Sequence, residues 1–360
     1  MTTTTSPAAT AQFRVFKQVP RILFGTGALE RLSELLPARG TTSYVYVIDD
    51  VFKGSPLWAR LKTAPSDRVV WFDAKTKEPS TAQVDRIRDE VAAGGAPAAV
   101  IGIGGGSTMD VAKALSVMLN HEGSSSQYQG WDLLQRAGVF KVGVPTVSGS
   151  GSEASRTAVL MGKDKKFGIN SDWSMFDAIV LDSSLVKGVP ADQRFHSGMD
   201  CYIHCVESMT GTMINELSRA YADRGLELCR KVFLGEGTDD DLMVASFMGG
   251  CSIVNSEVGV CHALSYGLSL ELGYRHGFAN CVAFDVLEEY YGPYVTEFRS
   301  MLKRQGVTWA KGAVRKLDGA AMDRMVAMTL KMERPLTNAL GPDFRDKLTP
   351  AKIKALYERM

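Results

Sequence analysis

The arrangement of apolar and polar residues changes about halfway along the chain. In the first half, short apolar runs predict β-strands at residues 43–48, 68–72, 98–103, 142–146 and 178–182. The run at 98–103 shows no alternation of apolar and polar side chains, as expected for a strand buried on both faces. Residues 81–93 repeat their apolar positions with helical spacing. Strands that alternate with helices predict a parallel sheet covered by helices.

The second half has a helical pattern with few strand signals. Apolar positions three and four residues apart predict helices at residues 194–209, 215–233, 239–254, 294–305, 319–332 and 351–360. We therefore expect three parts, because 360 residues exceed the usual size of one core. They are a disordered leader at residues 1–12, an α/β domain with a parallel sheet at 13–185, and an all-α domain at 186–360.

Charge and composition exclude several classes of protein. The 41 basic and 40 acidic residues nearly cancel, so nothing indicates a nucleic-acid partner. There is no secretory signal at the N-terminus and no run of about eighteen apolar residues, so we expect no membrane partner. All six cysteines lie at or after Cys201, which favours free thiols in a reducing cytoplasm. A zinc site that includes Cys201 and Cys205 is the alternative.

A glycine-rich turn follows the apolar run at 98–103. Gly104, Gly105, Gly106 and Ser107 lead directly into a helical stretch. Glycines let a ligand approach the backbone, and a helix N-terminus offers free N–H groups to a phosphate. The spacing fits neither the usual dinucleotide fingerprint nor a Walker A loop. A purely structural capping box between Ser107 and Asp110 is the alternative for those two residues.

A second loop of small and hydroxylated residues follows the run at 142–146. It contains Thr146, Ser148, Ser150 and Ser152. Two such loops after neighbouring parallel strands predict a nucleotide cleft at the carboxyl ends of the strands. Asp49 ends an earlier strand, where a carboxylate accepts a hydrogen bond from a ribose 2′-hydroxyl and favours NAD over NADP. An acidic residue in an exposed turn is the alternative for Asp49.

Four residues of the second half have the composition of a metal site. Asp200 and His204 are four apart, so on a helix they share one face. His262 and His276 would lie about 21 Å apart on one straight helix, so the chain must break between them, near Gly273. Imidazoles with one carboxylate suit Fe(II) or Zn(II). His121 and His196 have no partner at ligand spacing and are assigned no role.

These motifs together resemble the iron-containing, metal-dependent alcohol dehydrogenase family along nearly the whole chain. The glycine turn with Asp110 and Lys113 resembles the family's G-G-G-S-x-x-D-x-x-K element. The loop from Pro145 resembles its P-T-T-x-G-T-G-S-E loop, with departures at Val147, Ser148 and Ser150. The segment around Asp200 and His204 resembles G-x-D-A-x-x-H-x-x-E, and His262 and His276 match the remaining ligands.

The resemblance implies an NAD(P)- and metal-dependent oxidoreductase with the dehydroquinate synthase-like fold, in which the first domain binds the dinucleotide and the helical domain binds the metal. It adds Asp110 and Lys166 to the candidate cofactor residues and implies a homodimer that acts on a small alcohol or aldehyde. Many members carry a second histidine where this chain has Tyr266. Either Tyr266 is the catalytic proton relay, or the substrate's hydroxyls and water are.

The segments around His204 and Tyr266 look closest to the 3-deoxy-D-manno-octulosonate 8-oxidase subgroup, whose substrate is a sugar acid with a terminal CH₂OH. The substrate carboxylate would then need a cation, for which Arg275 and Arg156 are candidates. Glu207 lies three residues after His204 and either orients a ligand or forms a plain helix salt bridge. A dehydroquinate synthase-like cyclase, a non-catalytic nucleotide-binding protein and an oxygen-dependent oxidase remain alternatives.

Overall fold

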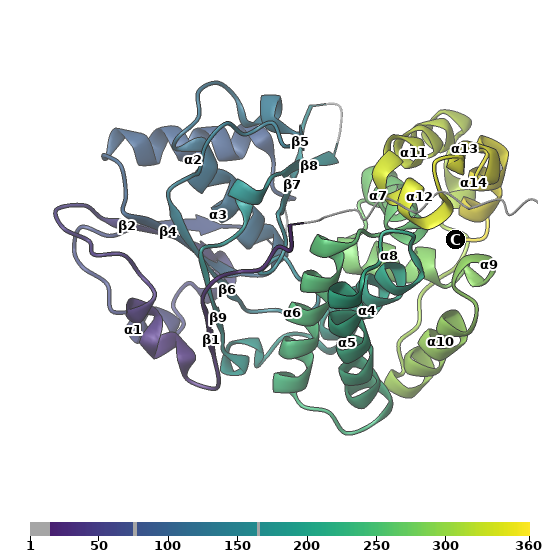
Figure 1. The fold of residues 1–360 in the computed structure, drawn as a ribbon, viewed down its shortest axis with the longest axis horizontal. Coiled ribbons are helices and arrows are strands. Elements are labelled where there is room, and N and C mark those ends of the chain that lie inside the picture. The colour runs from purple at the N-terminus through teal and green to yellow at the C-terminus, as the bar shows by residue number, and fades with distance from the viewer. Residues whose placement is uncertain (1–14, 75–77, 164–165) are drawn as a thin grey trace, which may run out of the picture.

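The computed structural model describes residues 15–74, 78–163 and 166–360. The expected leader at 1–12 lies outside these residues. An α/β part and a helical part lie side by side (Figure 1), and the chain passes from one to the other between Leu181 and Ala191. The expected fold class is confirmed, because a parallel sheet is followed by helices alone.

Six parallel strands form the main sheet, in the order β1-β9-β6-β4-β2-β3. Their bounds are Ile22–Phe24 (β1), Tyr44–Asp49 (β2), Arg68–Phe72 (β3), Ala99–Gly104 (β4), Phe140–Pro145 (β6) and Ala178–Leu181 (β9). All six residues of β4 are buried, as its uninterrupted apolar run predicted. In β4 and β6, Gly104 pairs with Pro145, so the two loops that follow these strands begin side by side.

Helices cover this sheet, as expected for parallel strands. The α/β part contains α1 (Leu57–Arg60), α2 (Thr81–Ala93) and α3 (Gly106–Met118). The amphipathic stretch at 81–93 has the predicted bounds, and the side chain of Ser80 caps it by accepting from Gln83 N. Helix α3 packs between the main sheet and a second one, so ten of its thirteen residues are buried.

The second sheet was not predicted. Its strands β5 (Gly130–Trp131), β7 (Thr157–Met161) and β8 (Lys166–Asn170) lie in the order β5-β8-β7, with β7 and β8 antiparallel. A strand of two residues has no periodicity to detect. Strands β7 and β8 have polar residues at their ends, Thr157, Lys166 and Asn170, which interrupt the apolar pattern that would have predicted them. This small sheet adds a further set of residues to the edge of the cleft described below.

The elements of the helical part are α4 (Ala191–Thr210), α5 (Glu216–Leu234), α6 (Asp239–Asn255), α7 (Val260–Leu272), α8 (His276–Phe284), α9 (Glu288–Tyr291), α10 (Pro293–Gln305), α11 (Gly319–Lys331), α12 (Glu333–Leu340), α13 (Phe344–Lys347) and α14 (Pro350–Tyr357). The six helices predicted in the second half are present as α4, α5, α6, α10, α11 and α14, whereas α7, α8, α9, α12 and α13 were not in the predicted set. Helix α4 packs against α5, α6 and α8, so twelve of its residues are buried, from Phe195 to Ser208. No single helix among the described residues is long and apolar enough to cross a membrane, although α6 and α7 together, bent by 106°, pass that test by length and composition.

A candidate metal centre facing a glycine-rich turn

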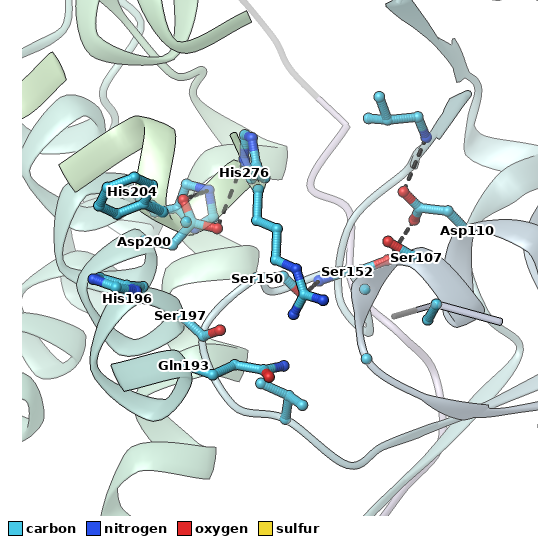
Figure 2. Close-up of a pocket in the computed structure, with 18 of the residues that line it drawn as sticks. Ser107, Asp110, Ser150, Ser152, Gln193, His196, Ser197, Asp200, His204 and His276 are labelled. Atoms are coloured by element: carbon cyan, nitrogen blue, oxygen red, sulfur yellow. Dashed lines mark hydrogen bonds and ion pairs between the residues drawn. The ribbon is translucent and has the colours of Figure 1, made fainter. Parts of the chain in front are cut away.

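A large cleft separates the two parts of the molecule. Its volume is about 1520 Å³, and both parts contribute to its walls. Asp200, His204 and His276 lie on the helical side, whereas Ser107, Asp110, Ser150 and Ser152 lie on the opposite side (Figure 2). The two groups of residues that the sequence singled out therefore line one cavity.

Three helices bring the four candidate ligands together. Asp200 and His204 lie one turn apart on α4, His262 lies in the first turn of α7, and His276 begins α8. The predicted break between the last two is real: α7 ends at Leu272, and Gly273 follows with a left-handed φ of 66°. One donor atom from each of the four residues lies within 4.8 Å of the others.

Asp200 is the centre of this cluster. Its Oδ1 lies 3.5 Å from Nε2 of His204 and 3.3 Å from Nε2 of His262, and its Oδ2 lies 3.7 Å from Nε2 of His276. The imidazole rings of His204 and His262 stack at 4.7 Å between centroids. Asp200, His204 and His262 are each at most 3% exposed, so solvent screens their charges little.

The pKa values of His204, His276 and Asp200 leave lone pairs available on these three residues. Burial lowers the pKa of both His204 and His276 to about 4, so these imidazoles are neutral near pH 7. Burial by itself raises the pKa of Asp200, but the three imidazoles bring it well below its ordinary value, and the carboxylate stays charged. Two neutral imidazoles and a carboxylate that converge out of water are a donor set for a cation.

Glu207 holds the third imidazole. The Nδ1–H of His262 donates to Oε2 of Glu207 (2.5 Å), while Tyr291 OH (2.5 Å) and the backbone N–H of Cys261 (2.7 Å) donate to Oε1. Burial lowers the pKa of His262, but Glu207 and Asp200 together raise it to about 10. This arrangement leaves Nε2 of His262 toward the cluster, as in a carboxylate–histidine pair behind a metal. Of the two roles considered for Glu207, the geometry supports ligand orientation.

Asn280 also contacts the cluster, and sequence reasoning missed it. Its side-chain nitrogen donates to Oδ1 of Asp200 (2.6 Å) and lies 3.1 Å from Nε2 of His262 and 3.2 Å from Nε2 of His276. The available signal was spacing, because Asn280 is four residues after His276 on α8. Three of the four donor residues, Asp200, His262 and His276, thus contact other buried polar groups, and the chemistry of the set fits a divalent ion such as Fe(II) or Zn(II).

The opposite wall presents the backbone of the glycine turn at the start of α3. Helix α3 begins at Gly106, and Gly105, Gly106 and Ser107 line the cleft. The capping-box alternative is wrong: the N-cap is Gly105, which has no side chain to accept a hydrogen bond, while Asp110 accepts from Ser152 Oγ (2.7 Å) and Val159 N (3.0 Å). The first N–H groups of α3 are therefore not occupied by Ser107 or Asp110.

The glycines of this turn have different roles. A Cβ at Gly104 would lie 2.5 Å from the Thr108 hydroxyl, and Gly104 is not among the residues lining the cleft, so its small size serves packing. A Cβ at Gly106 would lie 2.9 Å from Ser150 Oγ, inside the space between the two loops. This close approach of the Gly106 backbone to the Ser150 side chain fits a phosphate cradle at Gly105 and Gly106.

The remaining cofactor candidates also divide into residues that line the cleft and one that does not. Thr146, Ser150, Ser152, Asp49 and Lys166 line the cleft. Ser148 is buried and is not among the cleft-lining residues, so its prediction as a cofactor residue finds no geometric support.

Lys166 and Tyr266 lie close to the metal cluster. The Lys166 ammonium is 5.8 Å from the centre of the Tyr266 ring and pairs with Glu78 (3.1 Å). The Tyr266 ring meets the His276 ring edge-on, at 6.2 Å between centroids. Burial raises the pKa of the Tyr266 phenol above its ordinary value, and the carboxylates of Asp110 and Glu257 add to this. Tyr266 therefore stays protonated near neutral pH and interacts as a phenol.

The two histidines without an assigned role differ in position. His121 is buried away from the cleft, where its ring nitrogens bond to Val117 O (2.7 Å) and Gln135 N (3.0 Å). His196 lines the cleft one turn before Asp200, together with Gln193 and Ser197 on α4 (Figure 2). Helical spacing from Asp200 was the signal that could have identified His196.

The cysteines are not part of the cluster. All six are free thiols buried in the helical part. The Cys201 thiol donates to Ala245 O (2.9 Å), on the side of α4 that packs against α6. The four donors that the structure brings together among the described residues are one aspartate and three histidines, so the alternative of a cysteine-ligated zinc is wrong.

Comparisons with known proteins agree with this geometry. The sequence model described as iron-containing alcohol dehydrogenase matches residues 20–183, and that of the C-terminal part of the Fe-containing alcohol dehydrogenase family matches residues 194–337. Sulfoacetaldehyde reductase of Bilophila wadsworthia is 29% identical over 283 residues, which cover 74% of this chain and 73% of that protein.

Solved structures share the fold. A 1,3-propanediol oxidoreductase aligns with a TM-score of 0.81 and 21% identity, covering 96% of this chain and 99% of its own. The sulfoacetaldehyde reductase of Bifidobacterium kashiwanohense, solved in complex with NAD⁺, aligns with a TM-score of 0.77 and 19% identity, covering 96% and 98%. These findings do not favour the cyclase alternative, and they do not support the narrower sugar-acid oxidase subgroup. Two family matches over almost the whole chain, together with the buried Asp-His₃ cluster across from a glycine turn, show that this protein belongs to the iron-containing alcohol dehydrogenase family of oxidoreductases.

Proposed function

We propose that this protein catalyses reversible hydride transfer between a primary alcohol and NAD, with Fe(II) or Zn(II) held by Asp200, His204, His262 and His276. The observation that carries the proposal is that this donor set and the turn at Gly105 and Gly106 line one cleft from opposite sides. A divalent ion in such a site polarises a bound hydroxyl and lowers its pKa. Everything else in the reaction depends on how the chain positions and deprotonates the alcohol.

Glu207 and Tyr266 have separate roles in this reaction. Glu207 keeps the Nδ1–H of His262 engaged, so Nε2 of that ring faces Asp200. Tyr266 stands beside His276 as a neutral phenol, so it passes a proton by donating and accepting hydrogen bonds rather than by acting as a fixed base. Water or hydroxyls of the substrate can complete the same route to solvent.

The other wall would hold the dinucleotide. The N–H groups at the start of α3 suit the pyrophosphate, and the hydroxyls of Thr146, Ser150 and Ser152 lie on the same side of the cleft. Asp49 lies in the cleft at the end of β2, where its carboxylate would bond a ribose 2′-hydroxyl and repel a 2′-phosphate. We therefore propose NAD rather than NADP as the preferred cofactor.

For the substrate we propose a sugar acid oxidised at its terminal CH₂OH, as the sequence resemblance around His204 and Tyr266 suggests. Polar groups in the cleft near Tyr266 are compatible with a hydroxylated substrate. Of the two arginines first considered for its carboxylate, Arg156 is paired with both Asp132 and Asp172, whereas Arg275 lines the cleft next to His276 and stays a candidate.

The decisive experiment is metal reconstitution with a matched variant. Metal-free protein reloaded with Fe(II) or Zn(II) should produce NADH from primary alcohols, including a sugar acid, and should bind one ion per chain by elemental analysis. His262→Ala should lose both the ion and turnover. His121→Ala, which removes a buried histidine away from the cleft, should keep both. Full metal content and turnover in His262→Ala would refute the proposal.

A further inference from the structure

An arginine of the helical part lies against an aromatic ring of the α/β part inside the cleft. The guanidinium of Arg334, from α12, sits 4.4 Å from the centre of the Trp131 ring, from β5. Its Nε lies 2.7 Å from Oε2 of Glu257, in the segment between α6 and α7. All three residues line the cleft, so a cation held in a defined orientation is exposed to whatever enters it.

Glu257 holds the arginine without occupying the whole of it. The Glu257 carboxylate uses Oε1 to accept from the backbone N–H of Val258 (3.1 Å) and Oε2 to meet Nε of Arg334. A guanidinium has two further amino groups, each with two N–H donors in one plane. The Arg334 side chain remains 42% exposed, whereas that of Glu257 is 12% exposed. The arginine is therefore the member of the pair that a ligand can reach.

Two other cations of the cleft, Arg156 and Lys166, differ in this respect. Arg156 is flanked by two carboxylates and its side chain is 8% exposed. Lys166 is paired with Glu78 and its side chain is 4% exposed. Arg334 combines one carboxylate partner, an aromatic platform and access to the cleft, which is the combination that suits bidentate recognition of an oxyanion.

Arg334 also lies at the end of the cleft where the reaction is proposed to occur. Glu257 stands three residues before α7, the helix of His262 and Tyr266. Its carboxylate lines the same cleft as both of those residues, and α12, which carries Arg334, packs against α7. A molecule whose hydroxyl reaches the metal cluster and that extends past Tyr266 therefore brings its other end toward Glu257 and Arg334.

We propose that Arg334 is a specificity-determining residue that binds a carboxylate at the end of the substrate remote from the reacting carbon. Trp131 and Glu257 are positioning residues that hold the plane of the Arg334 guanidinium in a fixed orientation toward the ligand. The inference rests on the proposed function and narrows it: the preferred substrates are hydroxy acids several carbons long rather than neutral alcohols of the same length.

Gluconate and glucitol make the test, because both have six carbons and a terminal CH₂OH and only gluconate has a carboxylate. Binding to the metal-loaded protein is measured by calorimetry, and KM and kcat are measured with NAD. Wild type should prefer gluconate. Arg334→Gln should weaken gluconate binding and raise its KM roughly tenfold to a hundredfold, with little change for glucitol. Arg334→Lys should recover part of the preference.

The control is Arg345→Gln, which removes an exposed arginine paired with Glu333 outside the cleft. Equal binding of gluconate and glucitol by wild type, or an undiminished preference in Arg334→Gln, would overturn the inference. The calorimetric binding measurement distinguishes failure of this inference from failure of the proposed function. Arg334-dependent binding of gluconate without any NADH formation would contradict the dehydrogenase alone, whereas turnover without a carboxylate preference would contradict the role of Arg334 alone.

Discussion

The two walls of the cleft are built in different ways. The helical wall presents side chains: one aspartate and three histidines, of which Asp200, His262 and His276 contact the buried polar groups Glu207 and Asn280. The α/β wall presents backbone at its glycine turn, since Gly105 and Gly106 bring the start of α3 to the surface of the cleft. Changes on the helical wall should therefore alter metal binding, and changes on the α/β wall should alter cofactor binding while leaving the metal in place.

The largest effect is expected for Asp200→Asn. This change keeps the shape of the side chain but removes the carboxylate that lies within 3.7 Å of all three imidazoles. We expect loss of stoichiometric metal by elemental analysis and roughly a thousandfold or greater loss of kcat/KM. Asp285→Asn, which alters a buried carboxylate bonded to Arg299 outside the cluster, should retain the metal. If the Asp200→Asn protein kept its metal, the proposed role of the helical wall in metal binding would be contradicted.

A smaller effect on the same wall is expected for Glu207→Gln. Glutamine cannot hold the Nδ1–H of His262 as a charged acceptor, so the ring should lose its fixed orientation. Metal affinity should fall about tenfold to a hundredfold in competition with a chelator, while NAD binding is unaffected. Glu297→Gln, which disturbs a carboxylate bonded to Tyr202 and Arg230, is the control. Equal metal affinity in Glu207→Gln and wild type would show that Glu207 is only structural.

The opposite wall is tested by Gly106→Ala. The added methyl group would stand 2.9 Å from Ser150 Oγ, in the gap between the two loops. We expect the KM for NAD to rise about tenfold, with full metal content, because the methyl obstructs only the cofactor side. Gly319→Ala is a close control, since Gly319 also begins a helix, α11, and a methyl there meets no atom within 4 Å. Loss of metal in Gly106→Ala would mean that the two walls are not independent.

The sequence was informative where function depends on rare residues or on one element. Asp200 and His204 share a helix, and residues 81–93 repeat with an undisturbed period, so local spacing was sufficient. The cluster could be recognised because the chain has only five histidines. The glycine turn could be placed because it follows a strand buried on both faces.

Contacts between distant segments left no such pattern. Trp131 and Arg334 are about two hundred residues apart, and nothing near either one indicates that the small sheet brings them together. The hydrogen bond between Glu207 and His262 likewise depends on how α4 and α7 pack. Spacing shows which residues share an element, but it does not show which elements meet. The capping box that was the alternative for Ser107 and Asp110 is absent because Asp110 bonds to residues from the next loop and from β7 instead.

The smallest effect concerns Lys113, which ties the second loop to α3. Its ammonium is fully buried and donates to Ser152 Oγ (3.0 Å), Ser155 Oγ (3.0 Å) and Thr157 O (2.9 Å). Burial lowers its pKa from 10.5 to about 8, so between these values the unfolded chain binds more protons than the folded one. Folding is then disfavoured by the charged lysine below pH 8, and this penalty is relieved as the pH rises toward 10.5. Relative to Lys113→Met, the wild-type free energy of unfolding should therefore increase by about 1–3 kcal/mol across that range, measured by urea unfolding at both ends. A difference between the two proteins that does not change with pH would mean that Lys113 keeps its charge when buried, held by Asp110 more strongly than desolvation opposes it.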